Sequence, residues 1–230
     1  MEFNRESFIE GEILLINKPL NWTSFQVVNK IRWLIKKQYG IKKIKVGHAG
    51  TLDPLAEGLL ILCTGKMTKK ITEFQNLNKT YTGKLYLGAS TPSFDLETEI
   101  NERKSIDHLN EEILIETTED FKGKIIQTPP IYSAIKQNGK KLYEFARKGE
   151  TVKIKSREVF IHEFLISEIS LPEICFKVIC SKGTYIRSLA NDFGNKLNCG
   201  AHLIELTRTA IGEYNLDNSI SLDDFEKILR

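Results

Sequence analysis

The sequence predicts a globular α+β fold, and three observations support that prediction. Apolar residues make up 41% and charged residues 27% of the 230 residues, the proportions of an ordinary folded domain. Segments with strand periodicity are interspersed with segments of helical periodicity along the chain. A chain of this length buries roughly 70 to 75% of its unfolded surface, so one sizeable core is possible. We therefore expect a single domain over residues 1–230.

The chain is predicted to begin with a strand and a basic amphipathic helix. Residues 11–17 (GEILLIN) alternate and then become apolar, which indicates a strand that Lys18 and Pro19 end. Thr23 or Ser24 can cap the following helix, in which apolar residues recur at helical spacing. The lysines in its last turn suit the negative end of the helix dipole, so they have a structural explanation that needs no ligand.

The remaining elements follow from the same two periodicities. We expect strands over residues 59–63, 79–88, 123–130, 151–168, 174–181 and 201–214, and helices over residues 67–74, 106–116, 141–147 and 221–230. A glycine turn at residues 182–184 is predicted to lead into a further helix. Asn138 and Gly139 form a predicted turn within residues 129–150, a segment rich in lysine and aromatic residues.

Composition excludes several functional classes. The longest apolar runs are far shorter than the roughly 18 to 20 residues that a membrane-spanning helix needs, and the acidic N-terminus lacks the layout of a signal peptide. The four cysteines show no CxxC spacing, so no zinc site is expected. Cys63, Cys175 and Cys180 lie in apolar runs and are interpreted as small core residues. We expect a cytoplasmic protein that does not bind a membrane.

Basic residues gather in two segments, although the net charge of the chain is only +3. The first segment, residues 36–45, contains five lysines, and the second, within residues 129–150, contains five further basic residues. Such runs are commonly solvated faces, but two of them near a candidate site also suit contact with RNA phosphates. Both interpretations remain open from the sequence.

Residues 46–60 (VGHAGTLDPLAEGLL) are the strongest candidate for a functional site. Their first glycines can adopt backbone conformations closed to other residues, and His48 and Asp53 place polar groups beside them. A lone carboxylate next to an apolar strand is costly unless it is paired, hydrogen-bonded or used in chemistry. Alternatively, Asp53 caps a helix that begins at Pro54, and the local pattern alone favours this cap.

The stretch GHAGTLDPLAEGLL closely resembles the catalytic-aspartate motif of the TruB family of tRNA pseudouridine-55 synthases. Fourteen consecutive positions in nearly the family's pattern make a specific signal. Further stretches that resemble motifs of the same family are the strand-Lys-Pro-x-x-x-Thr-Ser opening, KTYTG, GTYIRSL and AHLIELTRTAIGEY. The resemblance runs from about Glu12 to Tyr214, nearly the whole chain.

The resemblance implies three catalytic residues. Asp53 corresponds to the family's catalytic nucleophile. Tyr81 corresponds to a tyrosine that stacks on the target base and assists proton transfer. The alternative is that Tyr81 only packs as a half-buried aromatic residue of a strand, which is what tyrosines in strands usually do. Arg187 corresponds to an arginine that pairs with the catalytic aspartate, a task for which a fork-shaped guanidinium is suited. Otherwise Arg187 is a surface residue of a first helical turn.

The resemblance also implies a substrate pocket. Tyr185 and Leu206 correspond to residues that line the uridine pocket, and Lys18, in the opening motif, is assigned to substrate binding. His48 is predicted to support the distorted RNA loop or to stack on a base. A hydrogen-bonded loop histidine is the alternative for His48, because imidazole adapts to many partners.

The fold that the resemblance implies is the pseudouridine synthase fold, a mixed and mostly antiparallel sheet with flanking helices and a central catalytic cleft. Residues 129–150 correspond to an insertion that clamps the T-loop of tRNA. Many family members continue into a C-terminal PUA domain, and this chain is expected to be a short form without it. We expect a monomer that acts on the T-arm stem-loop of tRNA and needs neither a metal nor a cofactor.

Two other functions are compatible with parts of the sequence. The basic segments would also serve a non-catalytic RNA-binding or RNA-chaperone protein. A glycoside hydrolase usually needs two facing carboxylates, and no second acid lies in a comparable motif. Residues 89–99 resemble the family's STxTxDxEG stretch only loosely, because the final glycine is missing, and no role is predicted for them.

Overall fold

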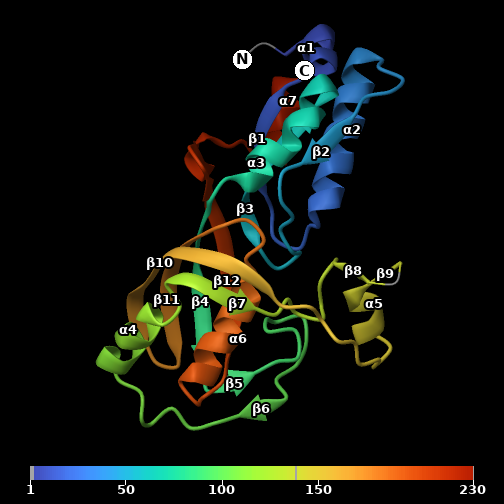
Figure 1. The fold of residues 1–230 in the computed structure, drawn as a ribbon. Helices are drawn as coiled ribbons and strands as arrows, with labels where there is room; N and C mark the ends of the chain where they lie inside the picture. The colour runs from blue at the N-terminus through green and yellow to red at the C-terminus, as the bar shows by residue number, and fades with distance from the viewer. Residues whose placement is uncertain (1–2, 138, 230) are drawn as a thin grey trace. The chain divides into compact units, whose positions relative to one another are not determined.

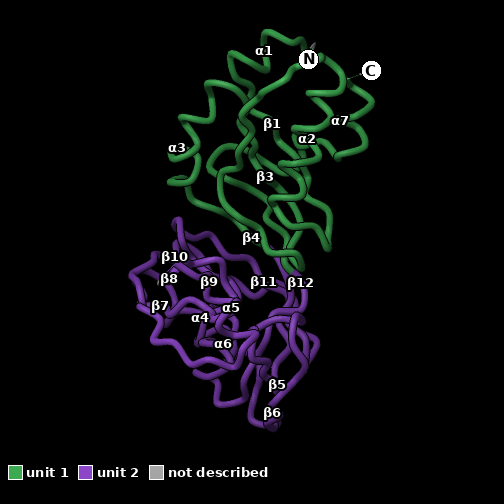
Figure 2. Tube along the Cα trace, turned by 90° about the vertical axis from the view of Figure 1, so that its right-hand side faces the viewer, with its two compact units in different colours: residues 1–81, 206–230 green, residues 82–205 purple. Residues whose placement is uncertain are grey.

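The computed structural model describes residues 3–137 and 139–229, and the chain forms two compact units (Figures 1 and 2). Unit 1 contains the residues up to 81 and from 206 onward, and unit 2 contains residues 82–205. Strands β4 (Lys79–Leu87) and β12 (Ala201–Ile211) each pass from one unit into the other. Within the described ranges, no helix has the length and apolar character to span a bilayer.

Unit 1 is built along strand β3 (Glu57–Thr64), whose apolar run is buried as its sequence predicts. Strands β1 (Ile13–Lys18) and β2 (Val46–His48) are antiparallel to β3, whereas β12 runs parallel to it. The other elements of unit 1 are α1 (Arg5–Glu10), α2 (Ser24–Tyr39), a 3-10 helix (Gly65–Lys70), α3 (Ile71–Asn76), β13 (Tyr214–Asn215), a second 3-10 helix (Leu216–Asn218) and α7 (Leu222–Ile228).

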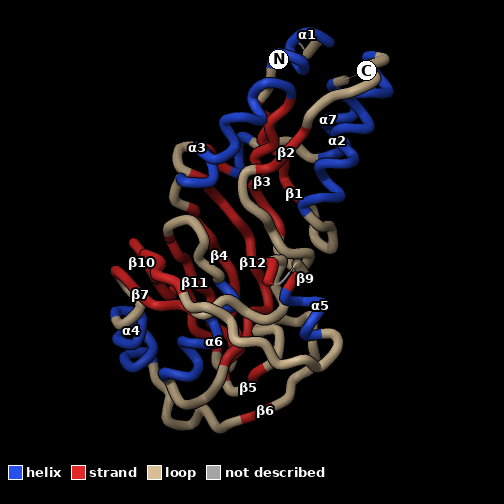
Figure 3. Tube along the Cα trace, turned by 45° about the vertical axis from the view of Figure 1, so that its right-hand side comes forward, coloured by secondary structure: helices blue, strands red, loops and turns tan. Residues whose placement is uncertain are grey.

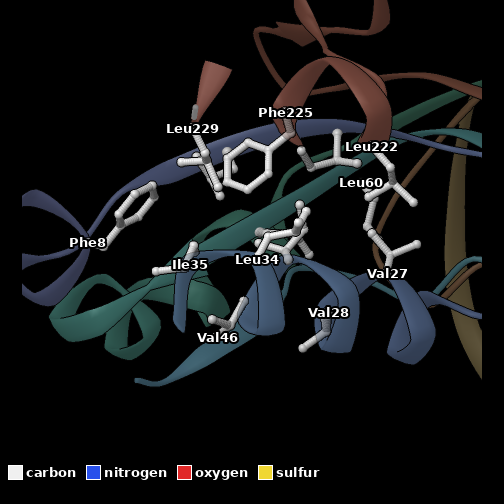
Figure 4. Close-up of a cluster of buried hydrophobic side chains, with 14 of the residues drawn as sticks. Phe8, Val27, Val28, Leu34, Ile35, Val46, Leu60, Leu222, Phe225 and Leu229 are labelled. Carbon is white, nitrogen blue, oxygen red and sulfur yellow. The ribbon is translucent and has the colours of Figure 1, made fainter. Parts of the chain in front are cut away.

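The larger core of unit 1 lies between α2, α7 and the strands β1 and β3 (Figure 4). Thr23 caps α2 as predicted, because its side chain accepts a hydrogen bond from the Gln26 N–H at 3.1 Å. The residues of α2 that recur at helical spacing are the ones that enter this core, namely Val27, Val28, Ile31, Leu34 and Ile35. From α7 the main contribution is Phe225, which is fully buried.

Unit 2 contains the antiparallel strands β7 (Gly123–Gln127), β10 (Arg157–Ser170) and β11 (Glu173–Cys180), with β10 between the other two (Figure 3). Its helices are α4 (Glu111–Glu119), α5 (Leu142–Ala146) and α6 (Ile186–Lys196), and its short strands are β5 (Ala89–Ser90), β6 (Glu102–Arg103), β8 (Lys136–Gln137) and β9 (Lys140–Lys141). The rings of Phe164, Phe176 and Phe193 meet in its core at centroid distances of 5.3 to 6.3 Å.

The predicted α+β class and the mixed, mostly antiparallel pairing are confirmed. Two predicted elements were wrong in extent, and one cysteine was wrong in burial. The helix expected from residue 106 begins at Glu111, because Asn110 caps it and accepts the Ile113 N–H. The strand expected from residue 151 begins at Arg157, and Cys175 is only half-buried. Asn138 of the predicted turn lies outside the described residues.

Helix α1 was not predicted, since its six residues are too few to show periodicity. Its start has a capping box, in which Asn4 accepts the Ser7 N–H at 2.8 Å and Ser7 accepts the Asn4 N–H at 3.4 Å. The apolar residue of α1, Phe8, is fully buried and meets the Phe225 ring at 6.4 Å. The helix is therefore stabilised by its cap and by the ring contacts of Phe8 in the core. The single-domain organisation stays a prediction.

Phe225→Ala should lower the free energy of unfolding by about 3 to 5 kcal/mol, because it leaves a cavity in the core of unit 1. Urea denaturation followed by circular dichroism measures this loss. Phe25→Ala is the control, since Phe25 on α2 is 63% exposed and its truncation should cost no more than about 0.5 kcal/mol. An equal decrease in unfolding free energy for the two variants would contradict the burial of Phe225 in the core.

Candidate active site

Asp53 lies in the loop that joins β2 to β3. The Ala56 N–H donates to the Asp53 carbonyl at 3.1 Å, which closes a turn through Pro54 and Leu55, and β3 begins directly afterwards at Glu57. No helix begins at Pro54, so the cap interpretation of Asp53 was wrong. The half-buried Asp53 side chain is therefore carried by a turn that leads into the most buried strand of unit 1.

The N-terminus of α2 holds the residue before Asp53. Ser24 is buried, and its hydroxyl donates to the Leu52 carbonyl at 3.0 Å while it accepts the Leu52 N–H at 2.8 Å. Both backbone groups of Leu52 are thus satisfied by one side chain on a neighbouring element. Because the two peptide units on either side of Leu52 are both bound, the direction in which the chain enters Asp53 is defined.

Arg208 on β12 holds the other side of the loop from within the core. Its side chain is 1% exposed, and it donates to the carbonyls of Leu59 at 2.7 Å, Gly50 at 3.1 Å and Thr51 at 3.5 Å. A guanidinium carries several N–H donors in a planar fork, so one side chain can bind several carbonyls at once. Arg208 was not predicted as a site residue, although an arginine inside the apolar strand LIELTRTAI is itself a signal.

Gly58 allows Arg208 to come this close. It pairs with Lys18 of β1 on one side and with Arg208 of β12 on the other. Its φ of +102° lies in the region that favours glycine, and a Cβ atom there would lie 2.4 Å from the Arg208 carbonyl oxygen. Lys18, Gly58 and Arg208 therefore form a row across β1, β3 and β12 in which the central position has no space for a side chain.

Lys18 ends β1 as predicted, and its side chain is fully buried. Its ammonium donates to the carbonyls of Pro19 at 2.8 Å and Trp22 at 2.6 Å. Burial lowers the pKa of Lys18 from 10.5 to about 8, while the negative charges of Asp53 and Glu57 oppose that shift. The structure thus places a cation near the candidate carboxylate, and the predicted contact of Lys18 with substrate stays a prediction.

The other predicted residues of unit 1 lie on three strands. His48 ends β2, Tyr81 lies on β4 with 8% of its surface exposed, and Leu206 is half-buried on β12. Burial lowers the pKa of His48; a hydrogen bond with the Gly50 backbone opposes this, and the Arg208 charge adds to it. A neutral imidazole is favoured, which suits stacking or hydrogen bonding rather than ion pairing. The predicted roles of the three residues remain predictions.

In unit 2, Arg187 lies in the first turn of α6, as predicted, but it is buried. Its guanidinium donates to the carbonyls of Ser93 at 3.2 Å and Tyr132 at 2.8 Å. One nitrogen lies 3.4 Å from a carboxylate oxygen of Asp95, which is itself 5% exposed. Asp95 was not predicted as a site residue, because residues 89–99 match the family's motif only loosely.

Tyr185, directly before α6, is held through its backbone by Gln127 at the end of β7. The Gln127 amide donates to the Tyr185 carbonyl at 3.0 Å and accepts the Tyr185 N–H at 2.8 Å. Gln127 is fully buried, so both bonds are shielded from water. The Arg157 guanidinium lies 4.7 Å from the centre of the Tyr185 ring, a cation–π distance. The predicted pairing of Arg187 with Asp53 joins residues of different units and stays a prediction.

Residues 129–150 contain the β8–β9 hairpin and helix α5. The Tyr143 ring is half-buried, with the Lys141 ammonium at 5.3 Å and the Arg147 guanidinium at 5.2 Å from its centre. A pocket of about 500 Å³ in unit 2 is lined by parts of this segment together with Phe94 and Asp192. Burial raises the pKa of Asp192. In the described ranges no group of three His, Cys, Asp or Glu side chains could hold a metal ion.

Comparisons with known proteins agree with the motifs. Residues 36–186 match the model of the TruB family pseudouridylate synthase N-terminal domain, and residues 187–230 match the tRNA pseudouridylate synthase B C-terminal domain. The chain is 57% identical to a tRNA pseudouridine synthase B of Flavobacterium johnsoniae, over 98% of this chain and 99% of the relative. It is 53% identical to the protein of that name in Phocaeicola vulgatus, over 97% of this chain and 95% of the relative.

Solved structures share the fold. A chain in the crystal structure of a Cbf5-Nop10-Gar1 complex superposes with a TM-score of 0.69 at 28% identity, over 96% of this chain and 54% of that one. A chain of an H/ACA RNP bound to a substrate RNA containing 2′-deoxyuridine gives a TM-score of 0.68 at 26% identity, over 96% of this chain and 53% of that one. This chain therefore spans about half the length of those solved chains.

Lys18→Met should change how stability depends on pH. The folded chain holds the Lys18 pKa near 8, below the unfolded value of 10.5, so the unfolded chain binds more protons between these values. The unfolding free energy of the native chain should therefore rise relative to Lys18→Met as the pH increases from about 8 to about 10.5. Urea denaturation of both proteins at several pH values measures this difference.

The exposed Lys45 provides the control, since Lys45→Met removes an amine that solvent surrounds. The difference between this variant and the native chain should stay constant over the same range. A constant difference for Lys18→Met as well would show that burial does not perturb the Lys18 ammonium.

Proposed function

This chain belongs to the TruB family of pseudouridylate synthases, and we propose that Asp53 is the residue with which it begins the isomerisation of uridine-55 in tRNA. The chain is a tRNA pseudouridine synthase, an isomerase that converts this uridine to pseudouridine. The activity follows from membership of the family and from the near-complete overlap with its relatives. The assignment of individual residues to steps of the reaction is the proposal.

The observation that carries the proposal is the way in which the Asp53 loop is held. Ser24 binds both backbone groups of Leu52, and Arg208 binds the carbonyls of Gly50 and Thr51, so three successive residues before Asp53 are held by side chains. The Asp53 side chain itself is half-buried. Fixing the backbone in advance lowers the entropy that orientation of a reacting group otherwise costs.

The chemistry begins when the target uridine leaves its stack, which costs a few kcal/mol. The Asp53 carboxylate then acts as a nucleophile towards the nucleotide. The bond between C1′ of the ribose and N1 of the base breaks, the base turns, and a bond between C1′ and C5 forms. The hydrogen on C5 is lost as a proton and N1 gains one, so the product is an isomer of the substrate.

Tyr81 and Arg187 are proposed to support this step. The Tyr81 ring offers a face for the base and its hydroxyl a group for proton transfer. Arg187 is held by Asp95 and by the carbonyls of Ser93 and Tyr132, so the orientation of its guanidinium is set before substrate arrives. Such a preoriented cation is suited to stabilise negative charge during the reaction.

Release of tritium from a tRNA transcript labelled at C5 of uridine tests the function. The chain should release tritium from the native transcript, because the isomerisation replaces the C5–H bond. A transcript whose uridine-55 is replaced by cytidine should release none. Release from both transcripts would place the target at another uridine, and release from neither, with tRNA binding intact, would favour a non-catalytic RNA-binding function.

Asp53→Asn should abolish turnover, by at least about 1,000-fold, because an amide is not a nucleophile of this kind. The affinity for tRNA, measured by filter binding, should change little. Glu57→Gln removes the same charge four residues away and should keep the activity, since Glu57 is exposed at the start of β3. Loss of folding in Asp53→Asn, seen by circular dichroism, would instead assign Asp53 a structural role.

Finer features are part of the same proposal. We propose that the chain recognises the T-arm stem-loop, that it works in the cytoplasm as a monomer, and that residues 1–230 act as one catalytic domain with residues 129–150 as the RNA clamp. The family assignment and the basic, aromatic character of residues 129–150 support recognition of the T-arm. Light scattering of the free chain tests the monomeric state.

A further inference from the structure

Helix α2 carries a tryptophan, Trp33, on the side that faces away from the core. Its core face consists of apolar residues at helical spacing, among them Ile31 and Ile35, which are fully buried. Trp33 projects from the opposite side, because successive residues of a helix are rotated by about 100°. The Trp33 side chain is 51% exposed. Packing within unit 1 therefore does not account for a tryptophan at this position.

The surroundings of Trp33 are basic. The ammonium groups of Lys30 and Lys37 lie 5.2 and 4.9 Å from the centre of the indole ring. Lys30 also pairs with Glu226 of α7 at 3.1 Å, so part of its charge is neutralised. Lys36 and Lys37 are exposed and form no ion pair with any described residue. Of the two ammonium groups beside the exposed indole, that of Lys37 is thus available to a partner, and the exposed Lys36 precedes it in the helix.

The charge extends beyond the helix. Residues 13–52 contain eight of the 33 lysine and arginine residues of the chain and none of its 30 aspartate and glutamate residues. The rest of the chain is therefore net acidic. Lys42, Lys43 and Lys45 follow the end of α2 and are exposed. The helix dipole explains lysines in the last turn of α2, but it explains neither the lysines that follow nor the exposed indole.

We infer that the solvent face of α2, centred on Trp33, is a second RNA-binding surface, which takes a part of the tRNA outside the T-arm. This inference rests on the proposed function for the identity of the RNA. An indole ring stacks on an unpaired base and lysines pair with the adjoining phosphates, the combination used by proteins that bind single-stranded or looped nucleic acid. A protein partner is disfavoured because lysine is depleted from protein–protein interfaces.

The distance along α2 separates this surface from the target nucleotide. Ser24, the first residue of α2, binds the Asp53 loop through Leu52. Trp33 lies nine residues further on, about 14 Å along the helix axis at 1.5 Å per residue. A single nucleotide at Asp53 does not cover that length, so Trp33 contacts another nucleotide of the same RNA, and the comparison below tests whether that nucleotide lies outside the T-arm.

The test compares full-length tRNA with an isolated T-arm stem-loop. Trp33→Ala combined with Lys36→Gln and Lys37→Gln should weaken binding of full-length tRNA by roughly tenfold or more, from loss of one stacking contact and two phosphate contacts. The slope of log affinity against log salt concentration should become shallower by about 1.4 to 1.8. Affinity for the stem-loop and the single-turnover rate at saturating tRNA should not change.

Matched variants separate stacking from charge. Trp33→Phe keeps an aromatic ring and should restore much of the binding that Trp33→Ala loses. The double variant Lys124→Gln, Lys196→Gln also removes two positive charges, but from exposed positions in unit 2. It should leave the affinity for tRNA almost unchanged. Alanine is favourable in an exposed helix, so Trp33→Ala should fold normally.

Two outcomes would overturn the inference. Unchanged binding of full-length tRNA by the triple variant would show that the surface does not contact RNA. Equal losses for full-length tRNA and for the stem-loop would place the contact within the T-arm. Tritium release by the native chain is measured in the same samples, so failure of the proposed function would be recognised separately from failure of this surface.

Discussion

The candidate site depends on the hydrogen bonds that the buried guanidinium of Arg208 donates to backbone carbonyls. It reaches from β12 to the carbonyls of Gly50, Thr51 and Leu59, and so joins the loop before Asp53 to the most buried strand of unit 1. A buried charge is stable only when its hydrogen bonds are satisfied, and here backbone carbonyls satisfy them. Gly58 makes this possible, because any side chain there would collide with the backbone of β12.

Each unit contains a buried cation that binds backbone carbonyls. In unit 1 the ammonium of Lys18 binds two carbonyls, and in unit 2 the guanidinium of Arg187 binds two carbonyls and lies beside the buried Asp95. Because these groups are desolvated, removal of any partner would leave a charge or a carbonyl unsatisfied. The chain segments that carry the proposed chemistry are thus held more rigidly than surface loops usually are.

Periodicity predicted most of the elements correctly because it reports a local property, the side of each segment that faces the core. The apolar spacing of α2 and the apolar run of β3 are confirmed as buried faces. Errors arose where no such signal exists. Pro54 after Asp53 suggested a helix, yet the chain turns there and enters a strand, because the pairing of β3 with its neighbours outweighs the preference of aspartate for a cap.

The sequence by itself determined the family, the position of Asp53 in a glycine-containing loop and the placement of Arg187 in the first turn of a helix, since motifs and periodicity are local along the chain. Only the tertiary structure decided which residues hold these groups. Asp95, which lies beside Arg187, and Arg208, which binds the loop before Asp53, are far apart in sequence from their partners. Such pairings form only when strands and helices pack, and no local pattern encodes them.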